Sequence, residues 1–228
     1  MVWSFGFGYY PGTGTAEGAP YPDMGILEPD DFHYRNVGFA NFAETMVPGI
    51  GPIGDALTSG FRVKAQDLPK KVRYDDARPV LDFDTMEAVD FVSPRAMALI
   101  ERFEPGVHQF EPVEYVRSDG THVADMFVFV VCRRLDTMDR AQTNMILYDD
   151  LVWLTAKAAR RYDPDLVGPE IDVEAKPRFV FNLRQIGDAH FWRDIYIRPT
   201  VYASDAIVEA IKAEGLTGFG GAPQETVA

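Results

Sequence analysis

The side chains best suited to catalysis or metal binding in this sequence are one cysteine and four histidines. Cys132 could act as a nucleophile if a histidine activated its thiol. It follows the strongly apolar run 126–131, where a buried and unreactive thiol is the usual finding. The histidines are scattered and lack the paired spacing of metal ligands on a helix: His33, His108, His122 and His190. These residues predict neither a catalytic nor a metal site.

A glycine motif matches the spacing of a dinucleotide-binding loop. Gly49–Gly54 has the sequence Gly-Ile-Gly-Pro-Ile-Gly. Such a loop needs a buried strand before it and a helix after it, so that the helix N-terminus meets the pyrophosphate. The preceding Glu44–Pro48 has no strand character, and Pro52 lies inside the loop. We therefore predict an ordinary loop and no bound cofactor.

A second motif, Pro164-Asp165 followed by Glu174-Ala175-Lys176, matches a pattern found in metal-dependent nucleases. In that chemistry two carboxylates hold a divalent ion while the lysine positions the attacking water. The Glu and Lys must lie on a core strand, but Pro177 follows Lys176 at once. We interpret the motif as a chance match.

The chain is acidic, with 35 Asp and Glu residues against 22 Lys and Arg, a formal net charge of −13 and a pI near 4.7. Such a surface repels phosphate backbones, so it disfavours nucleic acid and favours a basic partner. No apolar run is long enough to span a membrane, and no N-terminal segment has the pattern of a secretion signal. One cysteine excludes an internal disulfide. We expect a cytoplasmic protein.

A repeated pattern predicts two similar strand–helix units that would position any site. Phe91–Ile100 and Tyr202–Ile211 each combine an extended segment, a serine and an amphipathic helix. Ser93 and Ser204 are predicted N-caps, because a serine hydroxyl can accept a hydrogen bond from an unpaired amide of the first turn. Apolar residues fall at the same offsets from both serines, so each helix is expected to bury one face.

The order of the remaining patterns predicts an α+β fold with a mixed, mainly antiparallel sheet. Asp119-Gly120 separates two apolar stretches, Val107–Arg117 and Thr121–Leu135, and is a strong signal for a β-hairpin. We expect a weakly helical segment over about 137–161 and a loose tail from Gly220 onward.

The first sixty residues differ in composition from the rest, since they contain 11 of the 19 glycines. Gly and Pro disfavour long regular elements, while aromatic residues such as Trp3 and Tyr10 argue against disorder. We therefore predict an irregular arm over 1–60 that packs on a surface, followed by an α+β domain over 61–228. An arm that packs on a neighbouring subunit would make the protein a homo-oligomer.

Several segments in a fixed order carry a family resemblance: Phe91–Ser93 with its helix, Val107–Glu114, Arg133–Asp136, His190–Asp194 and Tyr202–Phe219. Together they resemble immunity protein family 11 of bacterial polymorphic toxin systems. The resemblance covers roughly residues 75–220 and leaves the Gly-rich first sixty residues largely outside. It implies a non-catalytic protein that binds and neutralises a cognate toxin domain encoded nearby, and it carries no catalytic residues to this chain.

The segment His190–Asp194 is aromatic, charged and placed between two predicted elements, so we predict that it contacts the partner. The residues concerned are His190, Trp192, Arg193 and Asp194. The alternative is a core tryptophan with a structural ion pair. A second class of function also stays open, an enzyme or small-molecule binder with a pocket between the two repeat units. A deep pocket lined by groups with strongly shifted pKa values would favour it.

Overall fold

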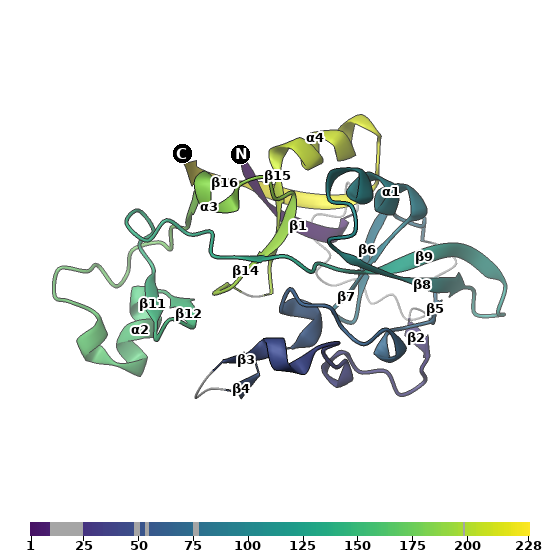
Figure 1. Ribbon diagram of the computed structural model, residues 1–228, viewed down its shortest axis with the longest axis horizontal. Coiled ribbons are helices and arrows are strands. Elements are labelled where there is room, and N and C mark those ends of the chain that lie inside the picture. The colour runs from purple at the N-terminus through teal and green to yellow at the C-terminus, as the bar shows by residue number, and fades with distance from the viewer. Residues whose placement is uncertain (10–24, 48–50, 53–54, 75–77, 198) are drawn as a thin grey trace.

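The computed structural model describes residues 1–9, 25–47, 51–52, 55–74, 78–197 and 199–228, which include two six-stranded sheets (Figure 1). Sheet A has the order β10–β14–β15–β1–β16–β13. Its strands are β1 (Val2–Tyr9), β10 (Arg134–Leu135), β13 (Val180–Asn182), β14 (Phe191–Asp194), β15 (Val201–Ser204) and β16 (Gly218–Val227). The β10–β14 and β13–β16 pairs are parallel, and the others are antiparallel. The first strand of the chain therefore lies in the centre of sheet A.

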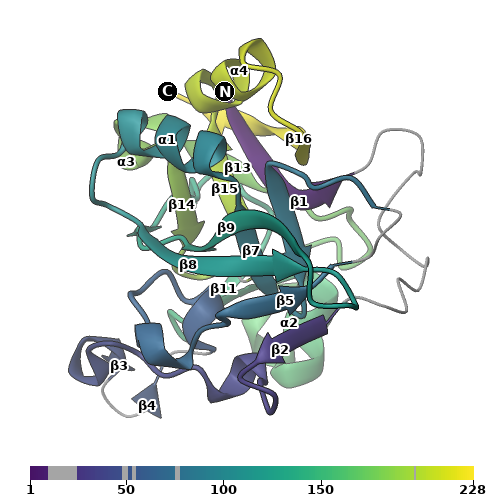
Figure 2. The ribbon, with the colours of Figure 1, turned by 90° about the vertical axis from the view of Figure 1, so that its right-hand side faces the viewer.

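Sheet B has the order β2–β5–β8–β9–β7–β6, and only its β5–β8 pair is parallel. Its strands are β2 (Gly25–Glu28), β5 (Lys71–Arg73), β6 (Phe83–Met86), β7 (Val89–Val92), β8 (Gln109–Val116) and β9 (His122–Val130). The predicted hairpin around Asp119-Gly120 is the turn between β8 and β9, the long pair that crosses Figure 2. The two mostly antiparallel sheets confirm the α+β class.

Helices and short strand pairs complete the described part of the chain. The α-helices are α1 (Pro94–Phe103), α2 (Ala156–Tyr162), α3 (Leu183–Ile186) and α4 (Asp205–Ala213). The short strand pairs are β3 (Met46–Val47) with β4 (Gly51–Pro52), and β11 (Ile146–Tyr148) with β12 (Val152–Leu154). The 3-10 helices are η1 (Tyr34–Asn36), η2 (Phe42–Thr45), η3 (Ala56–Thr58), η4 (Ala65–Asp67) and η5 (Pro164–Leu166). None of the helices described is both long and apolar enough to cross a membrane.

The repeated pattern forms two strand–serine–helix units, β7 with α1 and β15 with α4. The Ser93 hydroxyl accepts a hydrogen bond from the Ala96 amide at 3.2 Å, and Ser204 accepts one from Ile207 at 3.4 Å. Figures 1 and 2 place both helices at the same end of the molecule. Their buried faces pack in one apolar cluster: Ala96, Leu99, Ile100, Ile207, Val208 and Ile211. Apolar side chains therefore fill the space where these helices meet.

The carboxylate of Asp82, just before β6, joins the two units. It accepts hydrogen bonds from the Ser93 hydroxyl at 2.6 Å and from the Thr217 amide and hydroxyl at 2.9 and 3.0 Å. Gly218 follows with a φ of +85°, and a Cβ there would collide with the carbonyl of Phe83. Because glycine alone fits this approach, β16 can begin directly against β6.

The first sixty residues do not form one irregular arm in the described structure. Val2–Tyr9 is a strand paired on both edges, and the side chains of Val2 and Phe5 are buried. Phe39 and Leu57 also lie in the core, against sheet B. The sequence did not predict this strand, because the strands that pair with it, β15 and β16, lie about two hundred residues further along the chain. Homo-oligomerisation through the N-terminal segment stays a prediction, and residues 10–24 lie outside the described residues.

Two further segments differ from the sequence expectations. The tail is not loose, because Gly218–Val227 is a strand between β1 and β13. Hydrogen bonds to those two strands hold this glycine-rich segment in an extended conformation. Over 137–161 the structure has the β11–β12 hairpin, and helix α2 begins only at Ala156.

Candidate functional site

The segment predicted to contact a partner lies mostly inside the protein. Trp192 is fully buried, and its ring stacks on Tyr202 with 6.2 Å between the centroids. His190 is only partly buried, and its Nδ1 lies 2.7 Å from the hydroxyl of Ser204, the cap of α4. The burial of Trp192 fits the alternative interpretation of the segment, a core tryptophan with a structural ion pair. Contact of His190–Asp194 with a partner stays a prediction.

The two charged residues of the segment are buried with partners of their own. The Arg193 guanidinium lies 3.6 Å from the carboxylate of Asp90 on β7. Burial raises the pKa of Asp90 to about 6, although the charge of Arg193 and a hydrogen bond from Thr85 act in the opposite direction. Asp194 accepts hydrogen bonds from the amide and hydroxyl of Thr137 at 3.0 and 2.6 Å. The structure therefore places Arg193 and Asp194 where they hold elements together.

Glu104, at the C-cap of α1, is the centre of a buried polar network around this segment. Its carboxylate accepts hydrogen bonds from His108 Nε2 at 2.8 Å and from the amides of His190 and Phe191 at 3.0 and 2.7 Å. The Nε of Arg133 lies 3.1 Å away. Burial alone would raise the pKa of Glu104, but these hydrogen bonds outweigh it and lower the pKa below its usual value. The network fixes α1 against β14.

Cys132 is not paired with a histidine through its thiol. The thiol contacts the Val130 carbonyl at 3.2 Å, whereas the Cys132 amide donates to Nδ1 of His108 at 3.2 Å. Burial raises the pKa of the thiol to about 11, although the positive charge of Arg62 works against that shift. The thiol is therefore protonated at neutral pH, the state of an unreactive cysteine.

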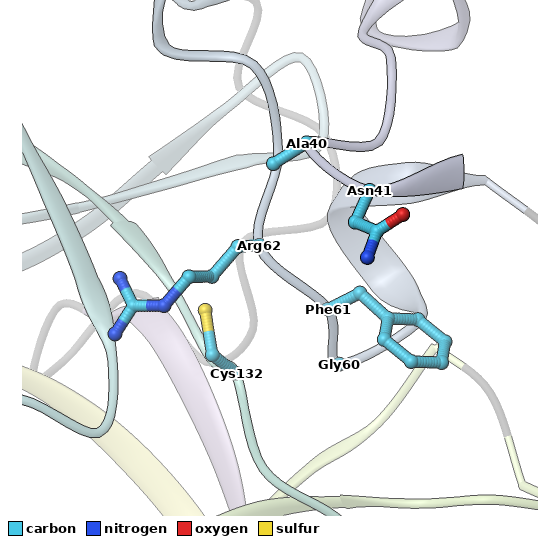
Figure 3. Close-up of a pocket in the computed structure, with 6 residues that line it drawn as sticks. All are labelled: Ala40, Asn41, Gly60, Phe61, Arg62 and Cys132. Atoms are coloured by element: carbon cyan, nitrogen blue, oxygen red, sulfur yellow. The ribbon is translucent and has the colours of Figure 1, made fainter. Parts of the chain in front are cut away.

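A pocket of about 310 Å³ opens beside this thiol (Figure 3). It is lined by Ala40, Asn41, Gly60, Phe61, Arg62 and Cys132. The guanidinium of Arg62 is already engaged, because it donates to the carbonyls of Gly106 and Val107 at 2.8 and 3.3 Å. What remains is a small cavity with an aromatic wall and an unreactive thiol.

A second pocket, of about 470 Å³, shares Ala40 with the first. Its charged lining residues are Arg35, Lys64 and Asp55. None of the described residues that line either pocket belongs to α1, α4 or the strands that precede them. The two pockets do not match the pocket between the units that the second functional class would require.

The two sequence motifs find no chemical role among the described residues. Asp165 lies in η5, and Glu174 forms a surface ion pair with Lys157 at 2.9 Å. Of Gly49–Gly54, Gly51 and Pro52 form β4, and the rest of the motif lies outside the described residues. Within the described ranges, no group of three or more His, Cys, Asp or Glu side chains is arranged to hold a metal ion.

Residues 146–176, which we call the lobe, contain the Pro164-Asp165…Lys176 motif, but the sequence did not predict them as a partner-binding surface. The lobe contains β11, β12, α2 and η5 and lies at the left of Figure 1, away from β8 and β9. Its small core consists of Ala156, Ala159 and Val167. Val152, Tyr162 and Leu166 are exposed on it. The sequence does indicate that Tyr162 is the last residue of a helix, because Asp163-Pro164 follows it. It does not indicate which face of that helix is exposed.

Fold and contacts together describe an α+β protein with buried polar networks, two pockets that both border Ala40, and an exposed lobe. The chain belongs to the immunity protein family (Imm11), whose model matches residues 28–225. The match confirms the resemblance and extends it toward the N-terminus, into part of the first sixty residues. No match is found among curated proteins.

Proposed function

We propose that this chain is a cytoplasmic immunity protein that binds a cognate toxin domain and neutralises it. The observation that carries the proposal is the family match over residues 28–225, which covers most of both sheets and both strand–helix units. The formal charge of −13 supports a basic partner, because opposite charge speeds association and orients the encounter.

Neutralisation by binding requires a stable surface that covers the toxin's active site. The buried networks around Glu104 and Asp82 hold α1, α4 and both sheets in fixed positions, so the surfaces of these elements are organised before a partner arrives. Preorganisation of this kind reduces the entropic cost of association.

Co-expression with the toxin domain encoded next to this gene tests the proposal. We expect cells that produce the toxin alone to stop growing and cells that also produce this chain to grow. A toxin inactivated at its active site is the control that links arrest to toxin activity. Size-exclusion chromatography with light scattering should show a stoichiometric complex. Growth arrest despite soluble, folded protein and no complex would contradict the proposal.

A further inference from the structure

Exposed apolar side chains concentrate on the lobe. Among the described residues, six large apolar side chains are more than a third exposed, and three of them are Val152, Tyr162 and Leu166. Tyr162 is the most exposed of the six, at 72%. Single exposed apolar residues are normal on protein surfaces, whereas a group on one small element indicates contact with a partner.

Three of the lobe's side chains form a continuous surface. Tyr148 on β11 and Val152 on β12 are directly opposite in the hairpin register, so their side chains lie on the same face of the hairpin. The ring of Tyr162, at the end of α2, stacks on Tyr148 with 6.0 Å between the centroids. Leu166 lies in η5, just after α2. The next residue, Val167, packs on Ala156 and Ala159 of α2 and so holds η5 against that helix. We call Tyr148, Val152, Tyr162 and Leu166 the tyrosine patch.

Acidic residues border the tyrosine patch on two sides. Asp149 and Asp150 form the turn between β11 and β12, and Asp163 and Asp165 follow Tyr162. Both turn aspartates have φ near +50°, a conformation that aspartate and asparagine adopt more readily than most residues. Residues 146–176 contain seven acidic and four basic residues, so the lobe is negative overall despite Arg160 and Arg161 on α2.

We infer that the tyrosine patch is the centre of the surface that binds the partner, and that it fits a basic protein surface with an apolar recess. Aromatic side chains ringed by charged residues are typical of the centre of an interface, because they bury a large area while the rim excludes water. A second copy of this chain is disfavoured as the occupant, since its own aspartates and its net charge of −13 would face the same charges. This inference rests on the proposed function.

Calorimetric titration of an inactivated form of the neighbouring-gene toxin into the full-length protein tests the apolar part. We expect Tyr162→Ala to weaken binding at least tenfold and Leu166→Ala severalfold. Leu183→Ala is the matched control, because Leu183 and Leu166 are 37% and 38% exposed and Leu183 lies on α3. It should bind within twofold of the unaltered protein. Circular dichroism and thermal unfolding establish that each variant is folded.

The charged rim is tested by association kinetics. Asp149→Asn with Asp150→Asn removes two charges without straining the left-handed turn, and Asp30→Asn with Asp31→Asn removes an exposed adjacent pair elsewhere. The first double variant should associate several times more slowly at low salt, with the difference disappearing at high salt. The second should match the unaltered protein.

The outcomes separate the two proposals. If the unaltered protein binds the toxin and both Tyr162→Ala and Leu166→Ala bind equally well, the tyrosine patch is not the interface and the proposed function stands. If the unaltered protein does not bind, the proposed function is overturned and the inference with it.

Discussion

The junction between the two strand–helix units and the lobe differ in what their carboxylates contact. At the junction Asp82 and Glu104 are buried, and each accepts three hydrogen bonds, two of them from residues more than eighty positions away in sequence. In the lobe the corresponding charges lie at the surface, as in the exposed ion pair of Lys157 with Glu174. The chain thus uses acidic residues to fix its interior in one region and leaves them facing solvent in the other.

This contrast separates stability from binding in the molecule. Substitutions at the junction should lower the free energy of unfolding, because they leave buried hydrogen-bonding groups without partners. Substitutions on the lobe should leave the fold intact and alter only what the surface can bind.

The largest expected effect is at Glu104. Glu104→Ala removes the acceptor for His108 and for the amides of His190 and Phe191, and should lower the free energy of unfolding by about 3 to 5 kcal/mol. Urea denaturation measures this value. Glu209→Ala is the control, since its carboxylate is exposed and pairs only with Lys212, and should cost about 0.5 kcal/mol or less. Equal losses in both variants would show that the network adds nothing beyond a surface pair.

The next effect is a dependence on pH that comes from Asp90. Burial raises its pKa to about 6 in the folded state, so between about pH 4 and pH 6 this carboxyl is more often protonated in the folded protein than in the unfolded chain. The free energy of unfolding should therefore fall as the pH rises through this range, by at most about 1.4 kcal/mol per pH unit from this group. Denaturation curves at several pH values measure the slope.

The variant Asp90→Asn isolates this contribution. It lacks the carboxyl and should have a shallower descending slope between pH 4.5 and 6, because only Asp84 and Asp194, whose pKa values burial also raises, still contribute. It should be less stable overall because Arg193 loses its carboxylate partner. The slopes are compared only above pH 4.5, because at lower pH the protonation of carboxyls with a lowered pKa, such as Glu104, also changes the stability. An identical slope in both proteins would assign the effect to other groups.

A smaller difference is expected between the two helix caps. Ser93→Ala should cost about 2 kcal/mol and Ser204→Ala about 1 kcal/mol. The loss is larger at Ser93 because its hydroxyl also donates to the buried carboxylate of Asp82, whereas Ser204 contacts the imidazole of His190. Thermal unfolding compares the two, with the conservative Ser93→Thr as the control that retains a capping hydroxyl. The reverse order would contradict the assigned roles.

The smallest expected effect is on the lobe. Tyr162→Ala should change the free energy of unfolding by no more than about 0.5 kcal/mol, because the side chain is largely exposed and does not belong to the lobe's core. Chemical denaturation measures the change. A loss of several kcal/mol would mean that Tyr162 supports the fold, and the separation between the two regions would fail.

Local signals in the sequence predicted the elements that depend on neighbouring residues. Ser93, Pro94 and the apolar spacing that follows define α1, and the same pattern defines α4. Asp119-Gly120 defines the β8–β9 hairpin. In each case the determining residues lie in the element or directly beside it, so the local sequence is enough to predict the element.

Elements that depend on distant partners were not predictable in this way. β1 and β16 contain several glycines and pair with each other across the length of the chain, with β15 and β13 as their other neighbours. The burial of Arg193 depends on Asp90, about a hundred positions earlier, and no spacing rule connects the two. The tyrosine patch depends on the stacking of Tyr148 and Tyr162, which only the folded lobe brings together.

The pairing of β1 with β16 also sets the order in which the protein can be made. Val2 lies opposite Gln224, so the central strand of sheet A leaves the ribosome more than two hundred residues before its neighbour. At a synthesis rate of about 5–20 residues per second, that interval lasts roughly ten to forty-five seconds. During this time the apolar segment that contains Trp3, Phe5 and Phe7 has no neighbouring strand to pair with. The protein can complete its fold only after translation of nearly the whole chain.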